Sequence, residues 1–179
     1  MKVVLSCMDY RLTEEIMKKM REGVLVIRNA GANVNAVKKA LKRLEPEEVI
    51  FMPHTDCAAM NLVKSVIKGE RSVDMEVEEK LVSQFKGKDV EDLDRINAQV
   101  GEKLIKEVLP NANVTTELVD VSKIKWPERK TVYFLLKSQS KYEKDMVGGY
   151  ILQAPSKEDL SADVKIAESL GLKLQKSEF

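Results

Sequence analysis

The strongest constraint on the fold is the alternation of apolar runs and helical patterns in the first third of the chain. The runs KVVLSC, VLVIRN and EEVIFM are rich in β-branched residues and predict three strands. Between them, residues 12–23 and 34–44 place apolar side chains at helical spacing, as Leu12, Ile16 and Met20 do. Strand, helix, strand, helix, strand is the order of a parallel sheet with right-handed crossovers. The sequence therefore predicts an α/β fold with a mainly parallel sheet covered by helices.

The remainder of the chain continues this pattern less regularly. Helices are predicted at residues 58–69, 89–109 and 156–172, and strands at residues 114–121, 131–137 and 148–154, the last as a hairpin return. Residues 69–88 are charged and poorly patterned, which indicates a solvated connection or a lid. The apolar stripe from Val90 to Val108 predicts core packing. No linker or repeat divides the chain, so we expect residues 1–179 to form one domain.

The charge balance and the apolar runs limit the classes of partner. The 179 residues include 30 Lys and Arg against 29 Asp and Glu, a net charge of +1. This balance gives no reason to expect a nucleic acid or a membrane as partner. The first apolar run is too short for a signal peptide, and no run approaches the roughly 18 residues of a membrane span. We therefore expect a cytoplasmic protein with its two cysteines reduced.

The only histidine of the chain, His54, lies three residues before Cys57, and the other cysteine, Cys7, ends the first predicted strand. If the third strand lies beside the first, all three side chains meet at the carboxyl edge of the sheet, where ligands gather. Two thiolates and an imidazole suit Zn²⁺ and leave a fourth position for water, as in catalytic sites. The alternatives are buried apolar cysteines or a metal-free redox pair in a thiol protein.

Asp9 and Arg11 follow Cys7 at alternate positions, so in an extended segment the three side chains point the same way. A carboxylate held by a guanidinium next to the metal accepts a hydrogen bond from zinc-bound water. If the pairing breaks, the carboxylate becomes a fourth ligand instead. A surface ion pair of little value is the alternative. Two thiolates leave the zinc neutral overall, so we predict a hydroxide form that accumulates at mildly alkaline pH.

The segments CMDYR, RNAGA and HTDCAAM resemble, in this order, the Cys-x-Asp-x-Arg, Arg-Asn-Ala-Gly and His-x-x-Cys motifs of the β-class carbonic anhydrases. The resemblance covers residues 1 to about 60. It implies a doubly wound sheet with helices on both faces, zinc on Cys7, His54 and Cys57, and a dyad of Asp9 and Arg11 that positions the zinc-bound water. It further implies a lyase that reversibly hydrates CO₂ to bicarbonate through zinc-bound hydroxide, in a homodimer or higher oligomer.

The residues of the RNAGA segment each admit more than one role. The resemblance places Ala30 and Gly31 at the substrate pocket, although Gly31 is equally explained by turn geometry. Arg28 and Asn29 either satisfy loop backbone or make an oligomer contact. The chain begins in the first strand, without the N-terminal helical arm usual in the family. Glycines usual in the family are replaced here by Pro53 and Ala58. These departures indicate a divergent member.

Two alternatives keep the zinc site and change what it does. The ligand set would equally serve a hydrolase of a CO₂ analogue, COS or CS₂. A non-catalytic zinc-binding homologue would have Asp9 closing the fourth position. In the enzyme reading no second histidine is present as a proton shuttle, so proton transfer relies on buffer, water chains or a carboxylate.

Overall fold

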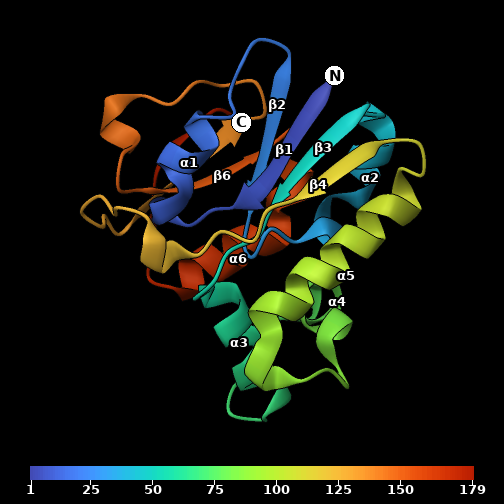
Figure 1. The fold of residues 1–179 in the computed structure, drawn as a ribbon. Coiled ribbons are helices and arrows are strands. Elements are labelled where there is room, and N and C mark those ends of the chain that lie inside the picture. Colours follow the sequence, from blue (N-terminus) through green and yellow to red (C-terminus); the bar gives the residue numbers. More distant parts are fainter.

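A seven-stranded sheet runs through the computed structural model, which describes residues 1–179 (Figure 1). The strand order is β4-β3-β1-β2-β6-β5-β7. The strands are Lys2–Cys7 (β1), Val24–Asn29 (β2), Glu48–Met52 (β3), Asn113–Thr116 (β4), Val132–Lys137 (β5), Tyr150–Ala154 (β6) and Lys173–Ser177 (β7). All neighbouring strands are parallel except β2 and β6, which are antiparallel and pair only at Arg28 and Gln153. The predicted α/β fold with a mainly parallel sheet is confirmed.

Helices cover both faces of this sheet. They are Thr13–Met17 (α1), Val34–Leu44 (α2), Ala58–Ile67 (α3), Met75–Lys80 (α4), Leu93–Val108 (α5) and Ser161–Ser169 (α6). Successive side chains of a strand point to opposite faces, so neighbouring residues of β1 enter different cores. Val3 and Leu5 pack in a cluster with residues of α2 and α5, whereas Val4 belongs to the cluster that contains Ile16 of α1. No helix is long and apolar enough to cross a membrane.

Strand β1 lies between β2 and β3, as the predicted meeting of the three ligand candidates requires. Cys7 is opposite Asn29 of β2, and Ser6 is opposite Met52 of β3. The carboxyl ends of the three strands therefore meet at one edge, and α3 and α4 lie beyond this edge (Figure 1). Residues that directly follow β1, β2 and β3 are brought together there.

The prediction of a solvated connection at residues 69–88 is wrong. This segment contains α4 and a 3-10 turn, Val82–Phe85, and it buries four apolar side chains in the core cluster below the sheet edge. These are Val77, Leu81, Val82 and Phe85. Two short helical pieces with a break at Leu81 do not give a sustained helical spacing of apolar residues. The helix is therefore not predicted from the sequence.

The stripe predicted on residues 89–109 is only partly correct. Helix α5 is present, but its buried face includes Asn97 and Gly101, while Val100 and Val108 are half-buried. A Cβ at position 101 would overlap the ring of Phe51, so glycine lets α5 approach β3 closely. Counting apolar residues at helical spacing does not detect the part of a buried helix face that consists of small and polar residues.

The hairpin return predicted at residues 148–154 is also wrong. Strand β6 forms there, but it runs parallel to β5, so residues 138–149 form a crossover. Strand β7 was not predicted because its five residues are all exposed on the edge of the sheet and lack apolar alternation.

Candidate metal centre

Three buried side chains from two strand ends and one helix start converge at the carboxyl edge of the sheet. Cys7 is the last residue of β1, His54 follows β3, and Cys57 is the N-cap of α3. One ligand atom from each lies within 4.8 Å of the others, and together they could hold a metal ion. Their exposures are 4%, 2% and 2%. The structure thus brings together the three residues that the sequence selected.

The imidazole of His54 has one nitrogen engaged and one free. Nδ1 lies 2.7 Å from the carbonyl oxygen of Thr55. Because a carbonyl only accepts, Nδ1 carries the hydrogen and donates, which leaves the lone pair on Nε2 in the neutral ring. Nε2 is buried and has no hydrogen-bond partner. A buried nitrogen without a partner beside two thiols fits a metal ligand.

The backbone around His54 is fixed by a segment from after β4. The Thr55 amide donates to the carbonyl of Val119 (2.9 Å), and the Val119 amide donates to the carbonyl of Pro53 (2.8 Å). His54 and Val119 form a parallel bridge. These contacts hold the Thr55 carbonyl that orients the imidazole, so the ring is positioned before any metal binds.

The two thiols differ strongly in acidity. A hydrogen bond from Cys57, together with the charge of His54, holds the pKa of Cys7 well below its usual range despite burial. Donating that hydrogen bond, and burial, raise the pKa of Cys57 well above its usual range. Burial would lower the pKa of His54, but the Cys7 thiolate and the Asp9 carboxylate raise it to about 9. The metal-free site therefore carries protons on His54 and Cys57, which a cation that prefers sulfur and nitrogen would displace.

Asp9 and Arg11 form a buried bidentate pair beside the three ligand candidates. Arg11 Nε donates to Asp9 Oδ1 (3.0 Å), and Nη2 donates to Oδ2 (2.7 Å). Burial alone would raise the pKa of Asp9, but the bonds from Arg11 lower it. Asp9 Oδ2 lies 3.9 Å from His54 Nε2. The site thus holds an ionised carboxylate next to the free imidazole nitrogen.

The pair is formed by a tight turn, not by the extended segment that alternation suggested. Asp9 is the N-cap of the 3-10 turn Tyr10–Leu12, and its Oδ1 accepts from the Arg11 amide (2.8 Å). The turn brings the side chains of residues 9 and 11 together on one side. The prediction that they meet is correct, and the expected backbone conformation is not.

The outer side of Arg11 is held by residues that the sequence did not single out. Nη1 donates to Asp56 Oδ2 (3.0 Å), and Nη2 donates to the Asp56 carbonyl (2.9 Å). The guanidinium carbon lies 4.9 Å from the ring centroid of Trp126. Trp126 is anchored by its Nε1–H to the Val121 carbonyl (2.8 Å) while half of it is exposed. Asp56 and Trp126 therefore also hold Arg11 in place, on its side away from Asp9.

Arg28 is wholly buried and holds the backbone that carries the site. Its Nε donates to the Cys7 carbonyl (2.9 Å), its Nη2 to the Asp9 carbonyl (2.9 Å) and its Nη1 to Thr13 Oγ1 (3.1 Å). Of the two roles considered for Arg28, the structure shows the satisfaction of backbone groups.

The turn after β2 lies directly against Cys7. The Gly31 amide donates to Cys7 Sγ at 3.4 Å. Gly31 has φ +82°, and a Cβ there would meet Ala59 Cβ at 3.0 Å, so the position needs glycine for both conformation and space. Ala30 is fully buried, and its amide donates to Asp163 Oδ1 (3.1 Å). Ala30 and Gly31, the two residues predicted at a substrate pocket, thus lie in the turn that contacts the Cys7 sulfur.

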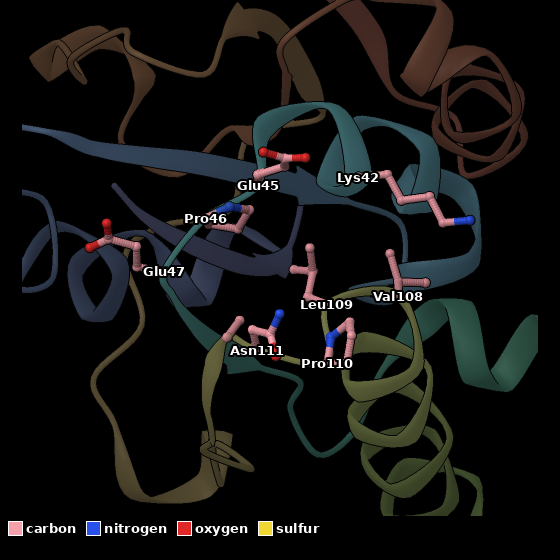
Figure 2. A pocket seen from close by; sticks show the side chains of 9 residues that line it. Lys42, Glu45, Pro46, Glu47, Val108, Leu109, Pro110 and Asn111 are labelled. Atoms are coloured by element: carbon pink, nitrogen blue, oxygen red, sulfur yellow. The ribbon is translucent and has the colours of Figure 1, made fainter.

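A separate hollow lies at the opposite end of the sheet. Its volume is about 570 Å³, and it is lined by residues of 42–47 and 108–112, as Figure 2 shows. Glu47 directly precedes β3, so the hollow is at the amino ends of the strands. It therefore shares no residue with the metal-ligand group.

Comparisons with known proteins find a matching family model and proteins of similar fold. The sequence model of a family described as carbonic anhydrase matches residues 2–131. Tetrameric β-carbonic anhydrases from Sordaria macrospora are similar in structure, at 17% identity over 68% of this chain and 76% of theirs, with a TM-score of 0.50. The β-carbonic anhydrase CcaA matches at 16% identity over 68% and 70%, also with a TM-score of 0.50. A carbon disulfide hydrolase matches at 22% identity over 69% and 75%, with a TM-score of 0.48. No curated protein matches the chain.

Proposed function

The chain belongs to the β-class carbonic anhydrase family, and from that premise we propose that it is a zinc enzyme that reversibly hydrates CO₂ to bicarbonate. One observation carries the proposal. The free Nε2 of His54 lies with two cysteine sulfurs in a group that could hold a metal ion. Asp9 is not a member of this group, and both of its oxygens accept from Arg11.

Cys7, His54 and Cys57 would hold the zinc ion, because thiolate sulfur and imidazole nitrogen are its preferred ligands. When bound, zinc supplies Lewis-acid chemistry that makes a water molecule nucleophilic, here at mildly alkaline pH because two thiolate ligands weaken the pull of the ion on the water proton. The contribution of the chain is to fix the ligands before the metal arrives. Thr55 orients the imidazole, and Gly31 donates to the sulfur of Cys7.

Asp9 is the residue we assign to orienting the nucleophile. Its lowered pKa keeps it ionised at neutral pH, so it only accepts hydrogen bonds. Each carboxylate oxygen has two acceptor sites, and the bonds from Arg11 leave capacity for one more donor. A protonated oxygen, such as water, satisfies that capacity, whereas an unprotonated anion is repelled. Arg11 would keep Asp9 from turning toward the metal.

The geometry favours this enzyme over a closed, non-catalytic site. For Asp9 to become a fourth ligand, its Oδ2 would have to exchange a 2.7 Å charge-assisted bond with Arg11 for the metal. Arg11 is itself held by Asp56 and Trp126, which resist its withdrawal. The catalytic proton would leave by water or buffer, since the only histidine is assigned as a ligand.

We extend the proposal to the domain organisation, the oligomeric state, the partners and the location of the protein. All seven strands belong to one sheet, which supports a single domain over residues 1–179. The family resemblance supports a homodimer or higher oligomer and a small-molecule substrate, CO₂ or bicarbonate, and we place the protein in the cytoplasm. Neither a nucleic acid nor a membrane is proposed as a partner, given the net charge of +1.

The test is stopped-flow CO₂ hydration by zinc-loaded protein between about pH 7 and 9, with zinc content measured in the same sample. The Cys57→Ser variant is the control, because serine keeps the size and removes the soft ligand. Activity that rises with pH and is lost in the variant supports the proposal. Bound zinc without CO₂ hydration, but with hydrolysis of COS or CS₂, would move the assignment to a CO₂ analogue. Bound zinc without either activity would favour the closed site.

A further inference from the structure

A buried carboxylate from the last helix contacts the metal site from beyond the matched family region. Asp163 lies on α6, after residue 131, and is 1% exposed. Its Oδ1 accepts a hydrogen bond from the Ala30 amide at 3.1 Å. Its Oδ2 is buried and has no hydrogen-bond partner. None of the roles described so far uses this side chain.

The contact of Asp163 fixes one side of the peptide that faces the Cys7 sulfur. The Gly31 amide, which donates to Cys7 Sγ, is the next amide after that of Ala30. On the other side, Asn97 Nδ2 donates to the Gly31 carbonyl at 2.8 Å. The Ala30–Gly31 peptide unit therefore lies between two peptide units that are held, the preceding one by Asp163 of α6 and the following one by Asn97 of α5. Since Gly31 has φ +82° and no side chain, these two contacts set the direction of its N–H.

The position of Asp163 is unfavourable for an ordinary core residue. Burial raises its pKa to about 7, although the Ala30 amide and the ammonium group of Lys80 act in the opposite direction. The nearby Cys7 thiolate raises it further. A carboxyl with one oxygen lacking a partner costs folding free energy that an apolar side chain of similar shape would avoid. Its presence therefore calls for a role at the loop that it contacts.

We propose that Asp163 is a positioning residue of the metal centre, which holds the Ala30 amide so that the Gly31 amide donates to the sulfur of Cys7. The inference rests on the proposed function, because Cys7 matters as a ligand only if a metal binds. A hydrogen bond to a ligating sulfur tunes its donor strength and fixes its orientation. Loss of such outer contacts weakens metal binding by about 10- to 100-fold.

The experiment measures zinc affinity by competition with a chromophoric chelator, and the sulfur-to-metal charge-transfer absorption of the cobalt-loaded protein. Asp163→Leu keeps the shape and removes the acceptor, and Asp163→Ala removes it with no risk of overpacking. Asp163→Asn keeps an acceptor oxygen and removes the charge. Asp159→Asn is the matched control: it removes a largely buried carboxylate from the turn that precedes α6, and this carboxylate bonds to neither Ala30 nor Gly31. Folding of each variant is checked by circular dichroism.

We expect the Leu and Ala variants to bind zinc about tenfold more weakly and to shift the charge-transfer band, and the Asn variants to stay within about threefold of the wild type. An unchanged band and affinity in a folded Leu or Ala variant would overturn the positioning role. So would an equal loss in Asp159→Asn, because that result would trace the effect to charge and not to the loop. A wild-type protein that binds no zinc would instead remove the proposed function itself.

Discussion

Replacing Arg11 by methionine would test how strongly the dyad depends on its arginine. The substitution keeps a long apolar stem but removes every hydrogen bond from the guanidinium to Asp9 and Asp56. Asp9 then remains as a buried carboxylate without its hydrogen-bonded partner, since both side chains of the pair are only 7–8% exposed. The charge that still faces it is that of protonated His54, whose Nε2 lies 3.9 Å from Asp9 Oδ2. The outer partner, Asp56, is 67% exposed and stays solvated.

The size of the expected loss of stability follows from the difference in burial between Asp9 and Asp56. Removing one partner of a buried, hydrogen-bonded ion pair costs about 3–5 kcal/mol, because the remaining charge is left unpaired. Losing the exposed pair with Asp56 adds at most about 1 kcal/mol. Because protonated His54 still faces Asp9, we expect the free energy of unfolding of the metal-free protein to fall by the lower end of this range, about 3 kcal/mol, at pH 7. In the zinc-loaded protein we also expect loss of CO₂ hydration, because Asp9 is no longer kept from turning toward the metal.

The difference in the free energy of unfolding between the wild type and Arg11→Met should depend on pH in one direction. In the wild type the folded pKa of Asp9 is lowered, so its contribution is present above the unfolded value of about 3.9 and is lost as pH falls through the folded pKa. In the variant, burial raises the folded pKa, so the penalty is full above that raised value and disappears below about 3.9. The difference between the two proteins therefore shrinks as the pH falls.

Urea unfolding of both proteins at pH 7 and pH 5 would measure this difference, with Asp56→Asn as the control for the exposed pair. The control should lose no more than about 1 kcal/mol at either pH. A loss below about 1 kcal/mol for Arg11→Met at pH 7, or a loss of the same size at both pH values, would refute the reasoning.

Three further predictions concern the surroundings of the dyad. Gly31→Ala should lower the free energy of unfolding by at least about 1–2 kcal/mol, measured in urea, since L residues are strained at φ +82° and the new Cβ would crowd Ala59. Trp126→Leu should cost about 0.5–1 kcal/mol through loss of the cation–π contact with Arg11, and Trp126→Phe should recover part of it. Zinc binding at pH 7 should release about two protons, from His54 and Cys57, seen in calorimetry as a buffer-dependent enthalpy. Release near zero would contradict the protonation of the metal-free site.

The centre of the fold is readable from sequence because local pattern and tertiary position agree there. Residues 24–29 and 34–44 form β2 and α2 with the predicted bounds. The carboxyl ends of neighbouring parallel strands share an edge, so the convergence of Cys7, His54 and Cys57 follows from strand order alone. Local pattern does not encode strand direction beyond this region, which is why the antiparallel junction of β2 with β6 was not predicted.

The supporting residues could not be found by spacing. Asp163 contacts Ala30 across 133 positions, and no motif surrounds Asp163. Trp126 belongs to an irregular segment, and nothing in its neighbours indicates that it lies on Arg11. Asp9 and Arg11 are two residues apart, which is close enough for spacing along the sequence to indicate that their side chains meet. Even there, spacing predicts an extended segment where the structure has a turn.

The charges buried around the site explain why its parts depend on one another. Cys7 and Asp9 are stabilised as anions, Cys7 by a hydrogen bond from Cys57 and the charge of His54, and Asp9 by Arg11. Arg28 makes none of its hydrogen bonds to a carboxylate and instead holds the carbonyls of the same two residues. In the metal-free site His54 and Cys57 carry one proton each, and one divalent cation that displaces both protons leaves the net charge of the site unchanged. A ligand site whose net charge is the same in both forms is able to fold before it is loaded, which suits a centre that is fixed by the sheet and not by the metal.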